Sequence, residues 1–176
     1  MIGTLIYVQD VLRLLRLLNR KYKLLLIITS LIVISDQVAK IFVDRTMHLY
    51  QSIEVLENFF HITYIRNKGA AFGMLSGADS SLRVPFFLVM STLAIGVIVY
   101  IIHKDEGKRD LFPITMALIL GGAIGNMIDR LRLGEVIDFL DVHWYQHHWP
   151  AFNIADSAIT VGAGLLILYM FKERKS

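Results

Sequence analysis

Two aspartates, Asp138 and Asp156, stand on either side of a short polar loop, close to long apolar segments of the chain. An ionised carboxylate at the edge of a bilayer is costly, so a membrane protein keeps one there when it is paired, hydrated or functional. Two carboxyl groups that lie close together cannot both ionise easily, so one retains its proton. The ionised member can then take a proton from water while the protonated member hydrogen-bonds a scissile carbonyl. The pair therefore predicts either peptide hydrolysis by direct attack of water or a structural cluster at a helix end.

Other polar residues fall near these acids or inside apolar segments. Asn126, Asp129 and Arg130 have helical spacings of three and four, so they share one helix face. An acid next to an arginine at a membrane interface is more often an anchor than a catalyst, which favours a supporting role. Asp36 and Lys40 are spaced i, i+4 within an apolar segment, where a polar pair is expensive, and we expect them to give architectural support.

The histidines of the segment 143–150 could indicate a zinc site, because His143 and His147 are four residues apart. Tryptophan and tyrosine surround them, which is more typical of an aromatic belt at a membrane interface. The chain has no cysteine, so a thiol nucleophile, thiolate metal ligands and disulfides are excluded. We expect no metal and no other cofactor.

The composition predicts a membrane protein. Of the 176 residues, 55% are hydrophobic, above the proportion usual for soluble domains. A helix needs about 20 mostly apolar residues to cross the hydrocarbon core. Four segments qualify, and we expect a single membrane domain over residues 1–176, with residues 1–23 as a cytoplasmic or interfacial extension. The predicted spans are Leu24–Val43, Val84–Ile102, Leu111–Ile128 and Ile154–Phe171.

The net charge of +3 carries information on topology. Basic residues precede the first span, separate the second from the third and follow the fourth, which marks these flanks as cytoplasmic. We therefore expect both termini inside and the loops 44–83 and 129–153 outside. Basic residues interleaved with aromatic ones, which would indicate nucleic-acid binding, do not form a stripe in this sequence.

The first outer loop has β character. Ser52–Ile65 is rich in β-branched and aromatic residues, and Asn67-Lys68-Gly69 is a turn signal. The predicted fold class is thus an all-α polytopic membrane protein, with four transmembrane helices and a small extracytoplasmic β element.

Five segments, in the same order along the chain, resemble motifs of bacterial lipoprotein signal peptidase, also called signal peptidase II. The resemblance runs from about Leu24 to Phe171. The segments are Asp36-Gln37-Val38-Ala39-Lys40, Asn67-Lys68-Gly69-Ala70-Ala71-Phe72-Gly73, Gly121-Gly122-Ala123-Ile124-Gly125-Asn126-Met127-Ile128-Asp129-Arg130, Val136-Ile137-Asp138-Phe139 and Phe152-Asn153-Ile154-Ala155-Asp156-Ser157.

The resemblance implies an intramembrane aspartic endopeptidase of the bacterial cytoplasmic membrane, with its active site near the extracytoplasmic face. Such an enzyme cleaves diacylglyceryl-modified prolipoproteins before the lipidated cysteine, and its partners are these substrates, membrane lipid and globomycin-type inhibitors. By position, Asp138 and Asp156 match the catalytic pair. Residues that match substrate-binding or supporting positions are Asn67, Gly69, Asn126, Asp129, Arg130, Asn153, Asp36 and Lys40.

The residues alone are also compatible with a second class of function. A small membrane transporter or proton-relay protein could also use clustered carboxylates. It would need acids along a path through the membrane, whereas the acids of this chain gather toward one face.

Overall fold

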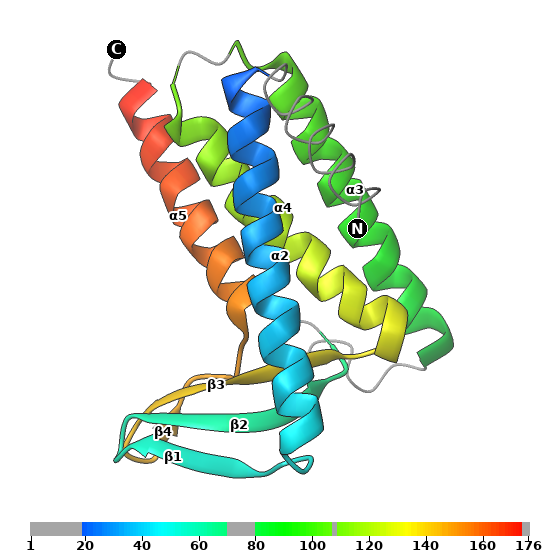
Figure 1. Cartoon of the computed structure of the whole chain (residues 1–176), viewed down its shortest axis with the longest axis vertical. Coiled ribbons are helices and arrows are strands. Elements are labelled where there is room, and N and C mark those ends of the chain that lie inside the picture. The colour runs from blue at the N-terminus through cyan, green and yellow to red at the C-terminus, as the bar shows by residue number, and fades with distance from the viewer. Residues whose placement is uncertain (1–18, 70–79, 107–108, 174–176) are drawn as a thin grey trace, which may run out of the picture.

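Four long helices make up most of the chain (Figure 1). The computed structural model describes residues 19–69, 80–106 and 109–173. The helices are α2 (Arg20–Thr46), α3 (Ser80–Lys104), α4 (Leu111–Leu133) and α5 (Ile154–Glu173). Each is long and apolar enough to cross a membrane, and each of the four predicted segments lies within one of them. This confirms the four spans of a multi-pass membrane protein.

Helix α2 begins at Arg20, inside the predicted N-terminal extension, so residues 20–23 are helical and continue directly into the first predicted span. Residues 1–18 of the predicted extension lie outside the described residues.

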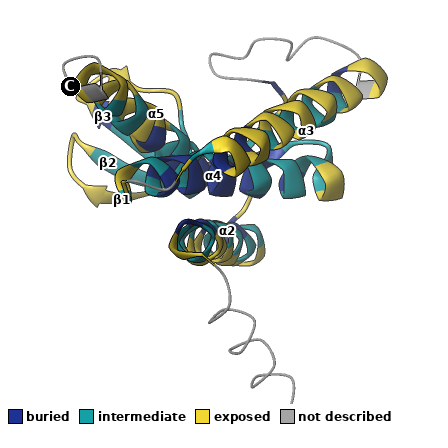
Figure 2. Cartoon of the chain, turned by 90° about the horizontal axis from the view of Figure 1, so that it is seen from above, coloured by how far each residue is buried: buried dark blue, intermediate teal, exposed yellow. Residues whose placement is uncertain are grey.

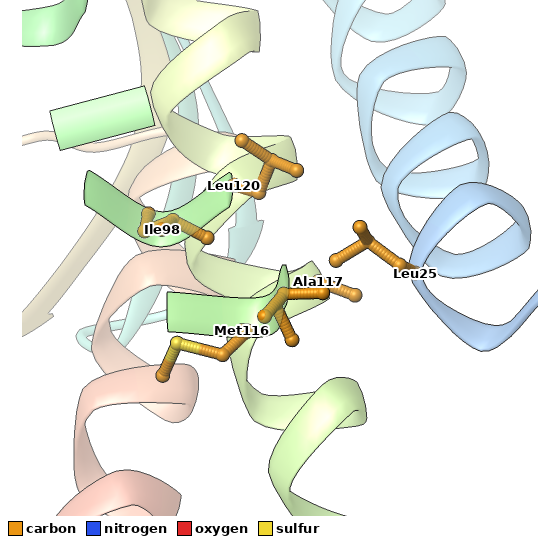
Figure 3. Close-up of a cluster of buried hydrophobic side chains, with 6 residues drawn as sticks. Leu25, Ile98, Met116, Ala117 and Leu120 are labelled. Atoms are coloured by element: carbon orange, nitrogen blue, oxygen red, sulfur yellow. The ribbon is translucent and has the colours of Figure 1, made fainter. Parts of the chain in front are cut away.

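Helix α4 lies between the other three helices (Figure 2). Half of the apolar stretch of α4 is buried by protein, whereas 17% or less of the apolar stretch of each other helix is buried. Figure 3 shows the apolar core at the end away from the sheet, where Met116, Ala117 and Leu120 of α4 lie near Leu25 of α2 and Ile98 of α3. The remaining apolar surface of α2, α3 and α5 is largely exposed and available to lipid.

Glycines allow α4 to approach its neighbours closely. A Cβ atom on Gly122 would lie 2.3 Å from the backbone oxygen of Ala155 in α5. A Cβ atom on Gly125 would lie 2.8 Å from a carboxylate oxygen of Asp36 in α2. Small residues at such spacings permit close helix packing in membranes, which is the role that their sequence pattern indicates.

An antiparallel sheet lies at one end of the helices (Figure 1). Its order is β1 (Ser52–Leu56), β2 (Phe60–Asn67), β3 (Val136–Trp144) and β4 (His147–His148). The predicted β character of 52–65 corresponds to β1 and most of β2. The all-α class is wrong, however, because the described part of the chain forms a four-stranded sheet as well as four long helices, so the fold is mixed.

Strand β3, like the short β4, is not predicted by the sequence pattern. Helix α4 ends at Leu133, and Gly134 adopts a left-handed conformation with φ of 72°, donating its N–H to the Arg130 carbonyl. This is a common way to end a helix. The chain then enters β3 at Val136, only two residues later. The tight connection places Asp138 in strand β3, five residues after the end of α4.

Candidate active site

The two aspartates of the predicted pair line one pocket. Asp138 lies in β3 and is 2% exposed, whereas Asp156 lies in the first turn of α5 and is half-buried. The pocket has a volume of about 1010 Å³ and opens between β2, β3, α4 and α5. The predicted residues that also line it are Asn67, Gly69, Asn126 and Arg130.

Asn153 connects the two acids. Its amide Nδ2 donates to Asp138 Oδ1 at 2.7 Å, and its Oδ1 accepts the backbone N–H of Asp156 at 2.8 Å. The second contact satisfies one of the free N–H groups at the start of α5, which is the usual work of an asparagine at a helix N-cap. Asn153 is fully buried, so its contacts are shielded from water.

Asn126 of α4 holds the second acid. Its Nδ2 donates to Asp156 Oδ1 at 2.7 Å. Its own oxygen accepts from Lys40 at 3.0 Å and from Asn153 at 3.2 Å. These two donors fix the orientation of the Asn126 amide, so that its N–H group faces Asp156.

Asn67, in the last position of β2, holds the first acid from the other side. Its Nδ2 donates to Asp138 Oδ2 at 2.9 Å. Its Oδ1 accepts the backbone N–H of Gly69 at 2.9 Å, which closes a local turn. Both oxygens of Asp138 therefore accept a hydrogen bond from an asparagine. Residues 70–73 of the same motif lie outside the described residues.

A buried ion cluster lies behind this layer of asparagines. Lys40 is fully buried, with its Nζ 2.8 Å from Asp36 Oδ2 and 2.8 Å from Asp129 Oδ2. Asp36 Oδ1 also accepts the backbone N–H of Ala155 at 2.9 Å. Asp129 Oδ2 accepts the backbone N–H of Ile137 at 3.2 Å. The cluster therefore joins α2 and α4 to the beginning of α5 and to β3, beside both acids.

Arg130 lies on the pocket wall. Its guanidinium is 4.6 Å from the centre of the Phe87 ring, which ties the end of α4 to α3. The sequence placed Arg130 on the same helix face as Asp129, but the two side chains lie in different environments. Asp129 is fully buried in the Lys40 cluster, whereas Arg130 is half-buried and faces the pocket.

The electrostatics of Asp138 favour a retained proton. Burial first, and the nearby charge of Asp156 second, raise the pKa of Asp138 to about 7, against the opposing hydrogen bonds from Asn67 and Asn153. At neutral pH the carboxyl of Asp138 is therefore close to half-protonated. A buried carboxyl group with such a pKa is a candidate for acid–base chemistry.

The aromatic residues of the predicted belt lie in and beside β3 and β4, and one of them, Trp149, lines the same pocket as the two acids. Trp144 and Trp149 are exposed, whereas His143 is buried and stacks on His148 with 4.5 Å between ring centres. His143 Nδ1 lies 3.1 Å from the Tyr145 carbonyl oxygen. Among the described residues, no group of three or more histidine, aspartate or glutamate side chains is arranged to hold a metal ion.

Sequence reasoning missed several polar residues near the site. Gln37 donates to Asp129 Oδ1 at 3.0 Å and to the Gly125 carbonyl at 3.2 Å, and Ser157 lines the pocket. Gln37 could have been identified from the sequence, because it adjoins Asp36 in an apolar segment. Arg66 also lines the pocket, and its contacts with neighbouring polar residues depend on a strand register that the sequence alone does not give.

Comparison with known proteins gives consistent matches over most of the chain. A family model described as signal peptidase (SPase) II matches residues 28–172. A lipoprotein signal peptidase of Geobacter sulfurreducens is 55% identical over 140 residues, which cover 80% of this chain and 86% of that protein. One from Geobacter metallireducens is 51% identical over 154 residues, which cover 88% of this chain and 94% of that protein.

Solved structures agree with these sequence matches. A bacterial membrane enzyme determined by the in meso method at 2.3 Å resolution is 38% identical, with a TM-score of 0.77 over 85% of this chain and 88% of that chain. A second one, at 1.9 Å resolution, is 35% identical, with a TM-score of 0.75 over 84% of this chain and 92% of that chain.

Proposed function

The chain belongs to the signal peptidase II family, and from that premise we propose that Asp138 and Asp156 form its catalytic pair. The chain is an aspartic peptidase that removes signal peptides from prolipoproteins. One observation carries the assignment of the pair. Asn153 donates to Asp138 and caps the helix turn that holds Asp156, and both acids line one pocket.

In the proposed mechanism, the two carboxyl groups share one proton near neutral pH. The ionised member takes a proton from a water molecule as the water oxygen bonds to the scissile carbonyl carbon. The protonated member donates to the carbonyl oxygen, which gives a neutral tetrahedral intermediate. The carbon–nitrogen bond then breaks as the leaving nitrogen receives the proton taken from water. The other proton returns to its carboxyl group, so the pair ends in its starting state.

The asparagines support this chemistry by position. Asn67 and Asn153 hold both oxygens of Asp138, and Asn126 holds Oδ1 of Asp156. Held carboxyl groups need little rearrangement on the way to the transition state, which is the main advantage of a preorganised polar site. We propose that Arg130, on the pocket wall, binds the backbone of the substrate.

The substrate is proposed to be a diacylglyceryl-modified prolipoprotein, cut before its lipidated cysteine. The pocket extends from the two acids along α5 to Ile159 and Val161, and Val161 is exposed. An apolar signal segment and acyl chains can therefore lie against α5 while the scissile bond reaches the carboxyl groups. Globomycin-type inhibitors are expected to compete for the same pocket.

For topology, we propose that the sheet and the pocket lie at the extracytoplasmic face of the bacterial cytoplasmic membrane and that both termini are cytoplasmic. The ends of the helices away from the sheet carry basic residues, among them Arg20, Lys21, Lys104 and Lys172, which is the pattern of cytoplasmic flanks. The acids of the candidate site gather at the sheet end. This distribution favours a surface reaction centre and gives no support to a transporter. We also propose that the four helices and the sheet form one membrane domain.

A processing assay tests the substrate assignment. The purified chain in lipid is incubated with a diacylglyceryl-modified precursor and, in parallel, with the same precursor before lipidation. We expect a cut immediately before the modified cysteine in the first sample only, identified by mass spectrometry and blocked by globomycin. Equal cleavage of both precursors would contradict the proposal that the enzyme recognises the lipid group of its substrate.

A further inference from the structure

A second polar cluster joins the end of α2 to strand β2, beside the pocket. It consists of Asp44, Tyr64 and Arg66. The Tyr64 hydroxyl and Arg66 Nη2 both donate to Asp44 Oδ1, the latter at 2.7 Å. Arg66 Nε donates to the Tyr64 hydroxyl oxygen at 2.8 Å, and its guanidinium lies 5.6 Å from the centre of the Tyr64 ring. The three side chains form a closed triangle, which we call the Asp44 triangle.

Tyr64 is the central member of the triangle. It is 4% exposed, although it lies in a strand beside an open pocket. Burial first, and then its hydrogen bond to Asp44, raise the pKa of the Tyr64 phenol. The hydroxyl therefore keeps its proton and remains a donor to Asp44 over the ordinary pH range.

The pairing of β2 with β3 is irregular before it resumes at Ile65, opposite Asp138. The register shifts between Ile62 and Ile65. Within this stretch, the backbone of Tyr64 pairs on its other side, where its N–H donates to the Gln51 carbonyl at 2.9 Å and its carbonyl accepts from Tyr50 at 2.8 Å. A bulge leaves a residue unpaired and disrupts the ladder locally. Side-chain contacts to helix α2 can hold β2 in place where its backbone pairing with β3 is interrupted.

The position of β2 determines the surroundings of Asp138. Asn67 immediately follows Arg66 and donates to Asp138 Oδ2 at 2.9 Å. Arg66 itself lines the pocket, so the triangle reaches the site wall. A shift of β2 along or away from β3 would lengthen the bond from Asn67 to Asp138.

One face of α2 serves both halves of the site. Asp36, Lys40 and Asp44 follow one another at intervals of four residues and so lie along one side of the helix. Lys40 holds Asn126, which holds Asp156. Asp44 holds β2 through the triangle. The helix therefore positions the partners of the two acids relative to each other.

We propose that Asp44, Tyr64 and Arg66 are positioning residues for the cleavage reaction, and that they hold β2 in the register at which Asn67 bonds to Asp138. The inference rests on the proposed function, because it takes Asp138 as catalytic. The triangle acts on the reaction through Asn67, so its loss should lower kcat more than it changes KM.

The Tyr64→Phe variant tests this inference, since it removes only the hydroxyl group. We expect kcat for a diacylglyceryl-modified precursor to fall about tenfold, with KM nearly unchanged. The hydrogen bond from Asn67 lowers the pKa of Asp138, whereas burial and the charge of Asp156 raise it. The variant leaves the other polar neighbours of Asp138 unchanged, namely Asn153, Lys40 and Arg130. Loss of the bond from Asn67 should therefore move the alkaline limb of the pH–rate profile to higher pH.

A double-mutant cycle separates this route from a general loss of structure. Tyr64→Phe should have little further effect in an Asn67→Ala background, because the bond that it disturbs is already absent. Where that background is too slow to measure, the shift of the pH–rate profile decides. Tyr145→Phe is the matched control, because Tyr145 is exposed in the turn between β3 and β4, and it should behave as the wild type. If Tyr64→Phe does not fold, Arg66→Lys keeps a cation near Asp44 without the Nε contact and should show the same signature.

Three outcomes would overturn the inference: a folded Tyr64→Phe variant with wild-type kcat, an equal loss in both backgrounds, or a loss with an unmoved pH–rate profile. The Asp138→Asn variant is assayed beside these proteins. If Asp138→Asn is inactive while Tyr64→Phe is fully active, only the positioning inference fails. If Asp138→Asn still cleaves the precursor, the proposed function itself fails.

Discussion

Asn153 and Asp138 are joined by an amide-to-carboxylate hydrogen bond of 2.7 Å, and the same asparagine caps the helix that carries Asp156. The donor group serves one acid and the acceptor group serves the other. A side chain with only acceptors, or with none, cannot do both. The bond therefore gives a direct way to separate the capping role of Asn153 from its role in the site.

Substitution of Asn153 should separate stability from activity. Asn153→Asp keeps an oxygen for the helix cap but places a carboxylate beside Asp138, so we expect at least a 100-fold loss of kcat/KM with a small change in thermal unfolding. Asn153→Ala loses the cap as well, which typically costs about 1 kcal/mol of stability. Both variants are compared by precursor cleavage and by thermal unfolding in detergent. Full activity of folded Asn153→Asp would contradict the role of the amide.

The pH dependence of cleavage should reflect the pKa of about 7 at Asp138. Below that pH the pair keeps its shared proton, and above it the proton is lost, so kcat/KM should fall by about tenfold per unit on the alkaline side. The measurement is a pH–rate profile with a lipidated precursor in a fixed detergent. A rate that is constant to pH 9 would contradict a proton shared by the pair.

Stability should depend on pH through the same group. The folded pKa of Asp138 lies above the ordinary value of 3.8, so its protonation favours the folded state. That contribution is fully present below the ordinary pKa and is lost as pH rises through about 7. We expect the unfolding temperature of the wild type to drop between pH 5 and pH 8, and Asp138→Asn, which cannot ionise, to show a shallower drop. An equal drop in unfolding temperature with pH for the two proteins would contradict the assignment of this pH dependence to Asp138.

Removal of the buried lysine should be strongly destabilising. Lys40→Met leaves Asp36 and Asp129 buried without their cation, and breaking one side of a buried ion pair typically costs about 3–5 kcal/mol. Arg20→Met is the matched control, because Arg20 pairs with Asp110 at an exposed site where the loss should be small. Thermal unfolding in detergent compares the two variants. Equal unfolding temperatures would show that the buried cluster does not stabilise the fold.

The close approach of α4 to α5 can be tested with two glycines. Gly122→Ala places a Cβ atom 2.3 Å from the Ala155 oxygen, so α5 must shift, and stability and cleavage should both decrease. A Cβ atom on Gly164, also in a helix, meets nothing within 4 Å. Gly164→Ala should therefore be neutral or stabilise the helix by up to about 1 kcal/mol. A neutral Gly122→Ala would show that the two helices have room to separate.

The helices could be predicted from the sequence because lipid imposes a simple rule, about 20 apolar residues for each span. Strand β3 could not be predicted so easily. Its segment Val136–Phe139 has an acid between apolar residues, and the sequence analysis included it in the outer loop 129–153 without assigning it to a strand. Its β-branched and aromatic residues were the available signal. The sheet at one end of the helices therefore makes the fold mixed where an all-α class was expected.

The candidate site was predictable in its residue types but not in its connections. Spacing placed Asn126, Asp129 and Arg130 on one helix face, and the structure divides them between a pocket and a buried ion cluster. The pairing of Lys40 with Asp36 follows from a spacing of four residues, whereas the second partner of Lys40 lies on another helix. Contacts between distant segments depend on packing and register, which local sequence patterns do not specify.

The most direct test of the account is cleavage of a diacylglyceryl-modified prolipoprotein by Asp138→Asn and Asp156→Asn, each compared with the wild type at equal folded concentration. Asparagine keeps the shape of each side chain and removes its capacity to exchange a proton. The account predicts that both variants bind the lipidated precursor and cleave it at least about 1,000-fold more slowly than the wild type. Cleavage at the wild-type rate by either folded variant would contradict the catalytic pair.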